Sequence, residues 1–349
     1  MKALFAAGGT GGHLYLAFAI AEKLRARGDD VLFVGTRDRL EARLVPEAGY
    51  ELATIRAHPL SRRISFDLAR TLVLNVAGFF ASLRVLHRVR PSIVVATGGY
   101  VSVPLVCAAR VYRTIARVRL PIALVEPNAT AGLANRMLAP LADETWTAQT
   151  TGIPVRASIL HLPPRDEAAA RLRLDPARKT LFALGASQGA RSINDAAIGL
   201  VRDDALPLGW QLLLLSGRAD YERVATAIGD RARVFAYLDD PSDAYAVADL
   251  VLSRAGSTLA EIAAVGLPAV LVPYPHAAEA HQAANAAAAA ATGGAVVIED
   301  AALAGGLAAL LLEVTQPTRL ARMRSSVPRR TRDATAAVVA RIDALRSRR

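Results

Sequence analysis

The sequence predicts an α/β protein of two domains, each built on a doubly wound parallel sheet. Its 349 residues exceed what one ordinary hydrophobic core accommodates, which favours two domains of similar size. Apolar runs of strand length alternate with segments of helix length along the chain, and many of these runs end at a glycine. The runs are rich in Val, Ile and Leu without polar alternation, which is typical of parallel strands that helices cover on both faces.

The predicted strands fall into two sets. The first set comprises KALFAA (2–7), VLFVG (31–35), SIVVATGG (92–99) and PIALVEP (121–127). The second set comprises TLFALG (180–185), QLLLLSG (211–217), RVFAYL (233–238), LVLSRAG (250–256), PAVLVPYP (268–275) and GAVVIE (294–299). Between the sets, TGIPVR (151–156) is a Gly/Pro stretch suited to a linker. We therefore expect domains over 1–155 and 156–321 with a cleft between them, followed by a basic helix over 322–349.

Composition limits the compartment and the partners. Cys107 is the one cysteine, which excludes a disulfide framework and a cysteine-based metal site and indicates a reducing compartment. The formal net charge is +11, and the excess of Lys and Arg lies in residues 1–160 and 322–349. This distribution favours nucleic acid, an anionic bilayer or a phosphate-bearing substrate as partner, although a solvated arginine-rich surface has the same composition. The amino-terminal residues form a strand pattern and contain no signal-peptide core.

The segment 61–91 departs from the alternating pattern because it is very apolar, with no charged residue over 71–83. That uncharged stretch is shorter than the ~20 residues that a membrane-spanning helix needs. Two interpretations stay open from the residues alone. Phe79 and Phe80 belong to a buried helix with charged ends, or the segment is a surface that dips into an anionic membrane.

The motif GGTGGH (8–13) joins the first predicted strand to a helix. Its glycines lack Cβ atoms, so backbone N–H groups can approach a ligand, and the helix start adds partial positive charge. A diphosphate is therefore the expected ligand. Leu14 occupies the last glycine position of GxGxxG and the GK[ST] of a Walker loop is missing, so neither NAD nor ATP is specifically indicated. A glycine turn for packing alone does not explain Thr10 and His13.

Two further strand–turn–helix segments lie in the second half, LGASQGARSIN (184–194) and SRAGSTLAEIAAVGLP (253–268). In the second, Thr258 followed by Glu261 matches a capping box, in which Glu261 only stabilises the helix start. In the other interpretation, Glu261 accepts hydrogen bonds from a ribose diol beside a phosphate held on N–H groups. Both interpretations predict an anion site at this helix start.

Polar side chains follow other predicted strands. In the first domain, ATGGYVSVP (96–104) and VEPNATAGLANR (125–136) bring Tyr100, Glu126, Asn128 and Asn135 to strand ends. In the second, PYPHAAEAHQAANA (273–286) brings His276, His281, Gln282 and Asn285 to a strand end. No carboxylate or cysteine set accompanies the two histidines, so no metal site is predicted.

Taken together, these motifs closely resemble the MurG family of glycosyltransferases, which add N-acetylglucosamine to lipid I in peptidoglycan synthesis. The matching stretches are GGTGGH, TGGYVSVP, EPNATAGLANR, TGIPVR, GASQGARSIN, SRAGSTLAE and PYPHAAEAHQAANA, in the family's order from residue 8 to 286. Each alone is weak, but the whole series is highly specific. The resemblance implies a glycosyltransferase B-type fold, with two Rossmann-like domains facing across a cleft.

The resemblance also implies partners and a location. The amino-terminal domain would bind lipid I, the undecaprenyl-diphosphate-linked acceptor, and would touch anionic lipids on the cytoplasmic face of the inner membrane as a peripheral protein. The carboxy-terminal domain would bind UDP-GlcNAc, and the final helix would pack back on the amino-terminal domain. Membrane lipid rather than nucleic acid is then the anionic partner, no cofactor is implied, and the membrane-facing interpretation of 61–91 is favoured.

Motif positions imply the site residues. Those implied to bind UDP-GlcNAc are Thr10, Gly11, Gly12, Asn128, Arg156, Ser187, Leu238, Ser257, Thr258, Leu259, Ala260, Glu261 and Gln282. Among them, Arg156 would contact the nucleotide, Leu238 would read uracil with its backbone, and Glu261 would hold the ribose. The four residues from Ser257 to Ala260 would hold phosphate at the helix start, and Gln282 would contact the sugar. Those implied on the acceptor side are Gly98, Gly99, Tyr100 and Asn135.

The chain departs from the family pattern at four places. VEPN (125–128) stands where HEQN is usual, Tyr15-Leu16-Ala17 replaces Pro-Ala/Gly-Leu, and Ile153 replaces the usual Asn of TGIPVR. The segment from Gly256 to Glu261 is one residue shorter than the common form, which leaves open which N–H groups contact phosphate.

The implied reaction inverts the α anomer of the donor into a β1→4 link to the C4 hydroxyl of MurNAc. His13 is the first candidate for the general base, because an imidazole with a pKa of ~6.5 suits proton abstraction near neutral pH. Bracing of the loop is the other role open to it, and Glu126 is the second candidate base. Two other functions stay open: transfer to another lipid or small aglycone, and a catalytically silent nucleotide-sugar-binding protein.

Overall fold

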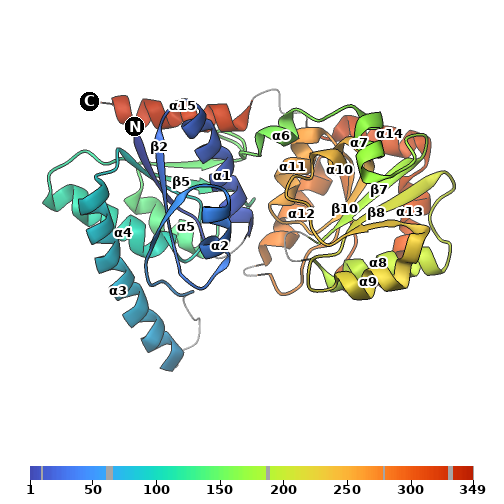
Figure 1. Ribbon diagram of the computed structural model, residues 1–349, viewed down its shortest axis with the longest axis horizontal. Coiled ribbons are helices and arrows are strands. Elements are labelled where there is room, and N and C mark those ends of the chain that lie inside the picture. Colours follow the sequence, from blue (N-terminus) through green and yellow to red (C-terminus); the bar gives the residue numbers. More distant parts are fainter. Residues whose placement is uncertain (9–10, 60–65, 186–188, 278–279, 329–332, 349) are drawn as a thin grey trace. The chain divides into compact units, whose positions relative to one another are not determined.

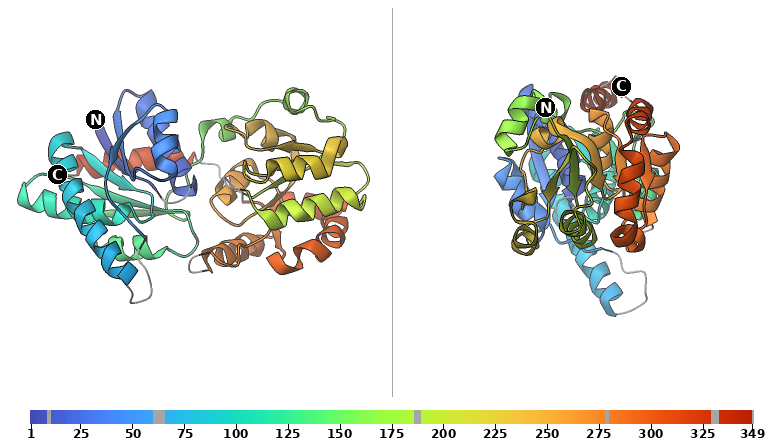
Figure 2. Two further views of the ribbon diagram at one scale, coloured as in Figure 1. Left: turned by 60° about the horizontal axis from the view of Figure 1, so that its bottom comes forward. Right: turned by 90° about the vertical axis from the view of Figure 1, so that its right-hand side faces the viewer.

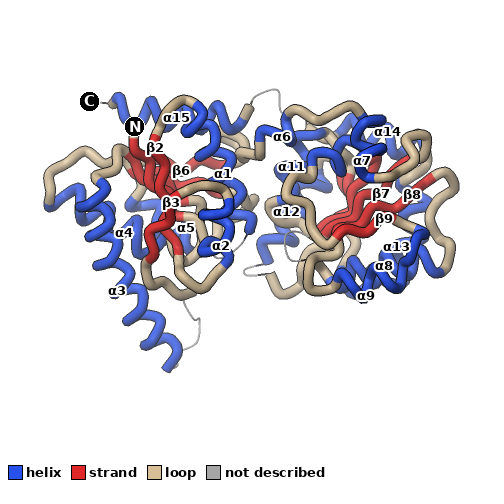
Figure 3. The backbone as a smooth tube through the Cα atoms, viewed as in Figure 1, coloured by secondary structure: helices blue, strands red, loops and turns tan. Residues whose placement is uncertain are grey.

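The computed structural model describes residues 1–8, 11–59, 66–185, 189–277, 280–328 and 333–348. The chain forms two compact units. Unit 1 comprises Met1–Arg156 together with Arg332–Arg349, and unit 2 comprises Ala157–Thr331. Each unit is a parallel sheet between layers of helices, as Figure 3 shows for both.

Unit 1 contains, in its described residues, a six-stranded parallel sheet with the order β3-β2-β1-β4-β5-β6 (Figure 1). The strands are β1 (Lys2–Ala6), β2 (Asp30–Gly35), β3 (Glu51–Thr54), β4 (Ile93–Ala96), β5 (Ile122–Glu126) and β6 (Glu144–Thr147). The helices are α1 (Gly11–Ala26), α2 (Leu40–Glu47), α3 (Phe66–Val89), α4 (Ser102–Ile115), α5 (Leu133–Leu138), the short η1 (Ala139–Leu141) and α15 (Ala334–Ser347).

Successive residues of the strands of unit 1 serve two opposite layers. Leu4 belongs to a buried cluster with residues of α3 and α4. Its neighbour Phe5 stacks on Phe33 with ring centroids 5.4 Å apart, and Phe18 of α1 lies edge-on to Phe33 at 5.4 Å. Because side chains of a strand alternate between faces, these contacts place α3 with α4 on one face and α1 on the other.

Unit 2 repeats this design. Its strands are β7 (Lys179–Leu184), β8 (Trp210–Leu215), β9 (Arg233–Phe235), β10 (Ala248–Ser253), β11 (Ala269–Leu271) and β12 (Ala295–Val297), in the order β12-β11-β10-β7-β8-β9. Its helices are α6 (Ala157–Leu160), α7 (Arg165–Leu172), α8 (Arg191–Arg202), α9 (Tyr221–Ile228), η3 (Gly229–Arg231), α10 (Ser242–Val247), α11 (Thr258–Val265), α12 (His281–Ala291), η5 (Asp300–Ala302), α13 (Leu303–Val314) and α14 (Pro317–Ser326). Both sheets have the doubly wound Rossmann order, so the predicted fold class is confirmed.

The strand orders determine where ligands bind. In unit 1 the direction of the strand order reverses between β1 and β4, and in unit 2 between β7 and β10. In doubly wound sheets, the crevice outside the carboxyl ends of such strands is the binding site. The segments that leave these strands are the glycine turn after β1, the loop 97–101 after β4, and the loop 254–257 after β10.

All the predicted runs are strands, but two strands were not predicted. β3 and β6 are four residues each, and each lies at an outer edge of the sheet of unit 1. Their sequences, ELAT and ETWT, carry polar residues because an edge strand is covered less completely than a central one. Their composition therefore lacked the continuous apolar pattern on which the prediction relied.

Helix α3 combines a packed face with an exposed one, and its amino-terminal end extends beyond the rest of unit 1 in both views of Figure 2. Val85 and Leu86 are buried, and a Cβ on Gly78 would lie 1.9 Å from the carbonyl oxygen of Arg56. Arg70–Val89 has the length and mean hydropathy, 1.4, of a helix that could cross a membrane, yet these contacts anchor it to the sheet domain.

The basic segment expected as one helix over 322–349 is divided between two. Residues up to Ser326 end α14, which belongs to unit 2, whereas α15 belongs to unit 1. On α15, Asp343 forms an ion pair with Arg27 of α1 at 2.7 Å, and Asp333 caps the helix by accepting a hydrogen bond from the Ala336 N–H at 3.0 Å. Arg119 donates to the Leu345 carbonyl at 2.8 Å.

Candidate functional site

The glycine turn of unit 1 packs directly on the loop after β4. A Cβ on Gly99 would lie 2.2 Å from the Gly8 carbonyl oxygen, so only glycine permits this approach. Gly98 and Gly99 both have positive φ, +98° and +80°, which glycine adopts without strain. The Thr97 hydroxyl donates to the His13 carbonyl at 2.9 Å and fixes the first turn of α1 against the same loop.

The ring of His13 lies against this bare backbone. A Cβ on Gly98 would approach the His13 ring to 2.9 Å at Cε1 and 3.1 Å at Nδ1, and the Nδ1 atom is buried. His13 stands in the first turn of α1, which begins at Gly11 and Gly12, where unpaired N–H groups and the helix dipole favour an anion. The predicted residue Thr10 lies outside the described residues.

The Glu126 carboxylate is the centre of a hydrogen-bonded loop at the end of β5. Its Oε1 accepts from the N–H and the side-chain amide of Asn128, both at 2.9 Å. Its Oε2 accepts from the Gly132 N–H at 3.0 Å and the Asn135 amide at 2.9 Å. Glu126 is only 3% exposed, so these four donors surround it. The carboxylate therefore shapes the loop and orients Asn128.

Glu41 is a buried carboxylate at the same edge of the sheet, and it was not predicted. Its Oε1 accepts from the N–H and the hydroxyl of Thr36 at 3.1 and 2.7 Å, and the Tyr100 hydroxyl lies 3.5 Å away. Burial, with a further contribution from the Glu41 charge, raises the pKa of Tyr100, although a hydrogen bond with Thr36 opposes this. Glu41 thus connects the Tyr100 hydroxyl to the glycine turn.

The start of α11 in unit 2 differs from the predicted capping box. The helix begins at Thr258, its N-cap is Ser257, and the Ser257 side chain makes no capping hydrogen bond. Glu261 instead accepts a hydrogen bond from the hydroxyl of the buried Tyr245, 2.9 Å from Oε2. The capping-box interpretation of Glu261 is therefore wrong, because a tertiary partner on α10 rather than the helix start orients the carboxylate.

The N–H groups at the start of α11 are not equivalent. Leu259 donates to the Gly256 carbonyl and Ala260 to the Ser257 carbonyl, both at 3.1 Å. Within the described chain, no backbone carbonyl accepts from the N–H groups of Ser257 or Thr258. Of the four residues implied to bind phosphate, Ser257 and Thr258 are thus the two whose N–H groups are available to a ligand.

Gln282 and Asn285 of α12 support the loop 254–257 that precedes α11. The Gln282 Oε1 accepts from the Tyr274 N–H at 2.9 Å, and its amide nitrogen would lie 3.8 Å from a Cβ on Gly256. Asn285 donates to the Ala255 carbonyl at 3.0 Å. Gln282 therefore faces the predicted phosphate loop, as a sugar-binding amide requires.

Arg254 is a second residue that was not predicted, and it joins three parts of unit 2. It is 8% exposed and donates to Asp300 at 2.5 Å, to the Ser192 hydroxyl at 2.8 Å and to the Val272 carbonyl at 3.2 Å. Burial opposes the effect, but the hydrogen bonds from Ser192 and Arg254 lower the pKa of Asp300. An arginine at the end of a buried strand was the only sequence signal for this network.

The other predicted residues are less constrained by described contacts. Arg156 lies over the ring of Tyr15, with its guanidinium carbon 4.7 Å from the ring centroid. Tyr15, which stands at the family's proline position, thus contacts a residue that is predicted to bind the nucleotide. Leu238 is half-buried in the loop after β9. Ser187 lies outside the described residues. Among the described residues, no group of three His, Cys, Asp or Glu side chains could hold a metal ion.

Known protein families match each of the two units separately. Residues 3–147 match the glycosyltransferase family 28 N-terminal domain, and residues 180–338 match the glycosyltransferase family 28 C-terminal domain. The chain is 38% identical to a protein of Halothermothrix orenii and 41% identical to one of Moorella thermoacetica, over 82% of each chain in both cases. Both are named UDP-N-acetylglucosamine–N-acetylmuramyl-(pentapeptide) pyrophosphoryl-undecaprenol N-acetylglucosamine transferase.

Two solved structures resemble the whole chain. Acinetobacter baumannii MurG aligns with a TM-score of 0.77 at 24% identity, over 98% of this chain and 99% of that one. CalG4, a calicheamicin glycosyltransferase, aligns with a TM-score of 0.66 at 16% identity, over 99% and 98%. At these identities the two structures support the fold alone.

Proposed function

The chain belongs to glycosyltransferase family 28, and on that premise we propose that it transfers N-acetylglucosamine from UDP-GlcNAc to the C4 hydroxyl of MurNAc in lipid I. The product is lipid II, the undecaprenyl-linked precursor of peptidoglycan. The observation that carries this proposal is the identity of 34–41% over 82% of the chain to relatives named for that reaction.

The donor side of the reaction belongs to unit 2. UDP leaves with the electron pair of the broken C1–O bond, and the available N–H groups of Ser257 and Thr258 at the positive end of α11 would stabilise that charge. Glu261, oriented by Tyr245, would accept hydrogen bonds from the ribose diol. Gln282 would bind the sugar, and the Leu238 backbone would bind the uracil. Arg156, which belongs to unit 1, would contact the nucleotide.

The acceptor side belongs to the glycine-lined edge of unit 1. The C4 oxygen attacks C1 of the sugar from the face opposite UDP, so the α anomer becomes a β link, and its proton passes to a base. We assign that role to His13, which stands in the first turn of α1 against the Gly98–Gly99 loop. Glu126, whose oxygens already accept four hydrogen bonds, is assigned to positioning Asn128 instead.

The decisive experiment supplies labelled UDP-GlcNAc with a lipid I analogue and measures UDP release and the glycosylated lipid. We expect UDP release to require lipid I and to yield a β1→4-linked disaccharide. Release with a diacylglycerol but not with lipid I would transfer the assignment to another acceptor class. Tight UDP-GlcNAc binding without any UDP release would identify a silent binding protein and overturn the proposal.

We further propose that the protein acts as a peripheral protein on the cytoplasmic face of the inner membrane, docked by α3. Its outward residues Leu72, Val73, Val76 and Phe80 are all more than half exposed, with Val73 at 68%. Their spacing puts them on one helical face, which Arg84 and Arg88 continue toward the carboxyl end. An apolar face with adjacent arginines fits the headgroup region of an anionic bilayer.

Vesicle sedimentation tests the docking surface. The double variant Val73→Ser/Phe80→Ser should lose most of its binding to vesicles that contain phosphatidylglycerol, because it removes apolar side chains that the fold leaves in water. Val111→Ser/Ile115→Ser on α4 is a matched control with two exposed apolar residues on another helix. Equal binding of wild type and α3 variant would refute docking by this helix.

A further inference from the structure

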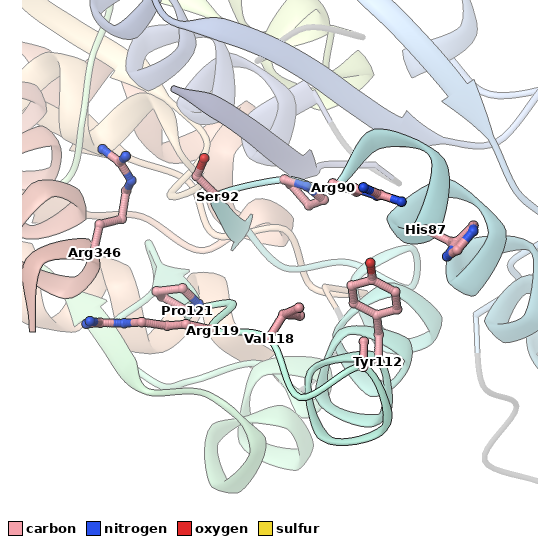
Figure 4. Close-up of a pocket in the computed structure, with 10 residues that line it drawn as sticks. His87, Arg90, Ser92, Tyr112, Val118, Arg119, Pro121 and Arg346 are labelled. Carbon is pink, nitrogen blue, oxygen red and sulfur yellow. The ribbon is translucent and has the colours of Figure 1, made fainter. Parts of the chain in front are cut away.

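A basic groove lies on unit 1 at the amino-terminal end of β4, whereas the glycine turn lies at the carboxyl ends of the strands. We define it by His87, Arg90, Ser92, Tyr112, Arg119 and Arg346, which surround a volume of about 580 Å³ (Figure 4). Ser92 directly precedes β4, whereas Thr97 and the glycine loop follow it. The groove is therefore separated from the candidate site by the length of the strands.

The groove carries an excess of positive charge. None of the residues that line it is acidic. Among the described residues, the His87 ring and the Arg90 guanidinium have neither an ion pair nor a hydrogen bond. The Arg119 guanidinium bonds only a neutral carbonyl, that of Leu345, and Arg346 approaches Asp343 no closer than 3.8 Å. A bound anion would balance this positive charge.

The residues that line the groove indicate which class of anion it binds. Guanidinium groups present paired N–H donors that match phosphate oxygens. The hydroxyls of Ser92 and Tyr112 add two neutral donors, and Val118 and Pro121 form an apolar wall between the two basic ends in Figure 4. We propose that the basic groove binds a phosphate ester whose carbon skeleton contacts this wall, either a soluble one or a phospholipid headgroup.

The test uses the double variant His87→Gln/Arg90→Gln, which breaks no described ion pair or hydrogen bond. Its matched control is Arg56→Gln/Arg110→Gln, which removes two exposed cations of unit 1 that lie outside the groove and outside α3. With UDP present at saturation to occupy the donor site, calorimetry measures the binding of glycerol 3-phosphate, and sedimentation measures binding to phosphatidylglycerol against phosphatidylcholine vesicles.

We expect wild type and control to bind, and the groove variant to bind at least tenfold more weakly, the effect of one or two lost charged hydrogen bonds. A selective loss with glycerol 3-phosphate identifies a soluble ester, and a selective loss with phosphatidylglycerol vesicles alone identifies a lipid headgroup. Equal loss in variant and control, or no binding of either probe, overturns the proposal.

Glu41 carries a second, independent inference, which rests on the proposed function. The Glu41 side chain fits between two glycines that have no Cβ atom. A Cβ on Gly8 would lie 2.9 Å from Glu41 Oε1, and a Cβ on Gly35 would lie 2.6 Å from Glu41 Cγ. The side chain is wholly buried, and its Oε2 accepts no hydrogen bond within the described residues. A buried carboxylate with one oxygen that accepts no hydrogen bond destabilises the folded protein, so a contribution to folding does not explain why Glu41 is present.

The contacts of Glu41 join the ends of three neighbouring strands. Gly8 follows β1, Thr36 follows β2, and Tyr100 lies in the loop after β4, whose Gly98 packs on the His13 ring. We propose that Glu41 is a positioning residue for the acceptor: through Tyr100 and the glycine turn, it sets the place of His13 relative to the acceptor hydroxyl.

The test compares Glu41→Gln, Tyr100→Phe and their combination in the full chain, with steady-state kinetics for both substrates. Wild-type turnover of UDP-GlcNAc with the lipid I analogue is measured first, so that a failure of the proposed function is recognised separately. Each single variant should raise the acceptor KM or lower kcat by about tenfold, the effect of one lost hydrogen bond to a charged group, and leave the donor KM within about twofold.

The double variant should be no worse than the more impaired single variant, because both changes break the same contact. The control is Asp143→Asn, a carboxylate of unit 1 that accepts from Arg113 and from the Ile122 N–H, away from the glycine turn. It should lower the thermal midpoint without changing either KM. Additive losses, or equal changes in the donor and acceptor KM, would leave Glu41 as a folding residue and overturn the proposal.

Discussion

Single residues at both sites are held in place by specific contacts with other residues. The His13 ring lies on Gly98, Glu126 gathers donors from the next nine residues, and Tyr245 reaches Glu261 from another helix. In two of these cases, a residue with a proposed substrate contact is oriented by one without such a contact: Glu126 orients Asn128, and Tyr245 orients Glu261. Substitutions of the holding residues should therefore change one kinetic parameter selectively.

His13→Gln should lower kcat by about 10²–10⁴-fold, because the acceptor hydroxyl loses its general base. The acidic limb of the pH profile of kcat should flatten in the same variant, since that limb reports protonation of the base. The UDP-GlcNAc KM should stay close to wild type. Turnover near the wild-type value would limit His13 to a bracing role.

Tyr245→Phe should raise the KM for UDP-GlcNAc by about tenfold, because Glu261 loses the hydrogen bond that orients it toward the ribose. The acceptor KM is the internal control and should not change. If the donor is replaced by a 2′-deoxyribose analogue, the effect of the substitution should shrink. An unchanged donor KM would contradict the ribose role of Glu261.

Asp220 gives a pH-dependent contribution to stability. A hydrogen bond from Arg223, assisted by Asn194, lowers its pKa from 3.8 to about 2. A depressed folded-state pKa stabilises the fold fully above the unfolded pKa, and this stabilisation is lost as the pH falls through about 2. Asp220→Asn should thus lower the urea midpoint by a constant amount between pH 5 and 7, and the difference from wild type should shrink at more acidic pH. A difference that grows toward acid would contradict this.

At these residues, the sequence predicted which segments meet but not which atoms bond. Strand ends carry their side chains to one edge, so the positions of His13, Glu126 and Glu261 followed from the pattern of runs. The partners did not: Tyr245 precedes Glu261 on a separate helix, and Glu41 stands in a helix with no motif of its own. Contacts between elements depend on tertiary packing, which local sequence does not encode.

At the scale of elements, α3 illustrates how one helix serves two surroundings. Its inner face packs so closely that Gly78 touches the backbone carbonyl of Arg56, and its outer face keeps Val73 and Phe80 in water. The sequence predicted an apolar helix here and left core and membrane surface open. Both faces are apolar, so only the packing of the sheet domain distinguishes them.

Gly78→Ala should destabilise unit 1 by about 1–3 kcal/mol, because its Cβ would overlap a backbone oxygen and α3 would have to shift. Gly199→Ala in α8 is the matched control, since no atom lies within 4 Å of the added Cβ. Gly199→Ala should stabilise by about 0.5–1 kcal/mol, as alanine does in a helix interior. Chemical denaturation of both variants checks the difference; a stable Gly78→Ala would refute the tight packing of α3.

At the scale of the whole molecule, each unit has its own core and one of the two tryptophans. Trp146 is fully buried in unit 1, and Trp210 is 4% exposed in unit 2. The repeated strand order was predictable, because the apolar runs of both halves have the same character. The short edge strands were not. The family resemblance alone implied the return of the final helix to unit 1, and the structure begins this return near residue 332 rather than at 322.

Single-tryptophan variants can follow the two units separately. UDP at about 100 times its Kd should stabilise the unit that binds it by about 2.7 kcal/mol. Trp146→Phe, which retains Trp210, should therefore show a higher fluorescence melting midpoint with UDP, and Trp210→Phe should show a much smaller shift. Equal shifts in both variants would mean that the two units melt together.

The return of α15 to unit 1 makes unit 2 an insertion in the sequence of unit 1. During synthesis, α15 leaves the ribosome only after all of unit 2, so Lys23 and Arg27 of α1 meet their partners Asp333 and Asp343 last. Unit 2 can fold while unit 1 still waits for its final helix. Nascent chains halted before residue 332 would therefore hold a donor-binding unit beside an unfinished acceptor-binding one.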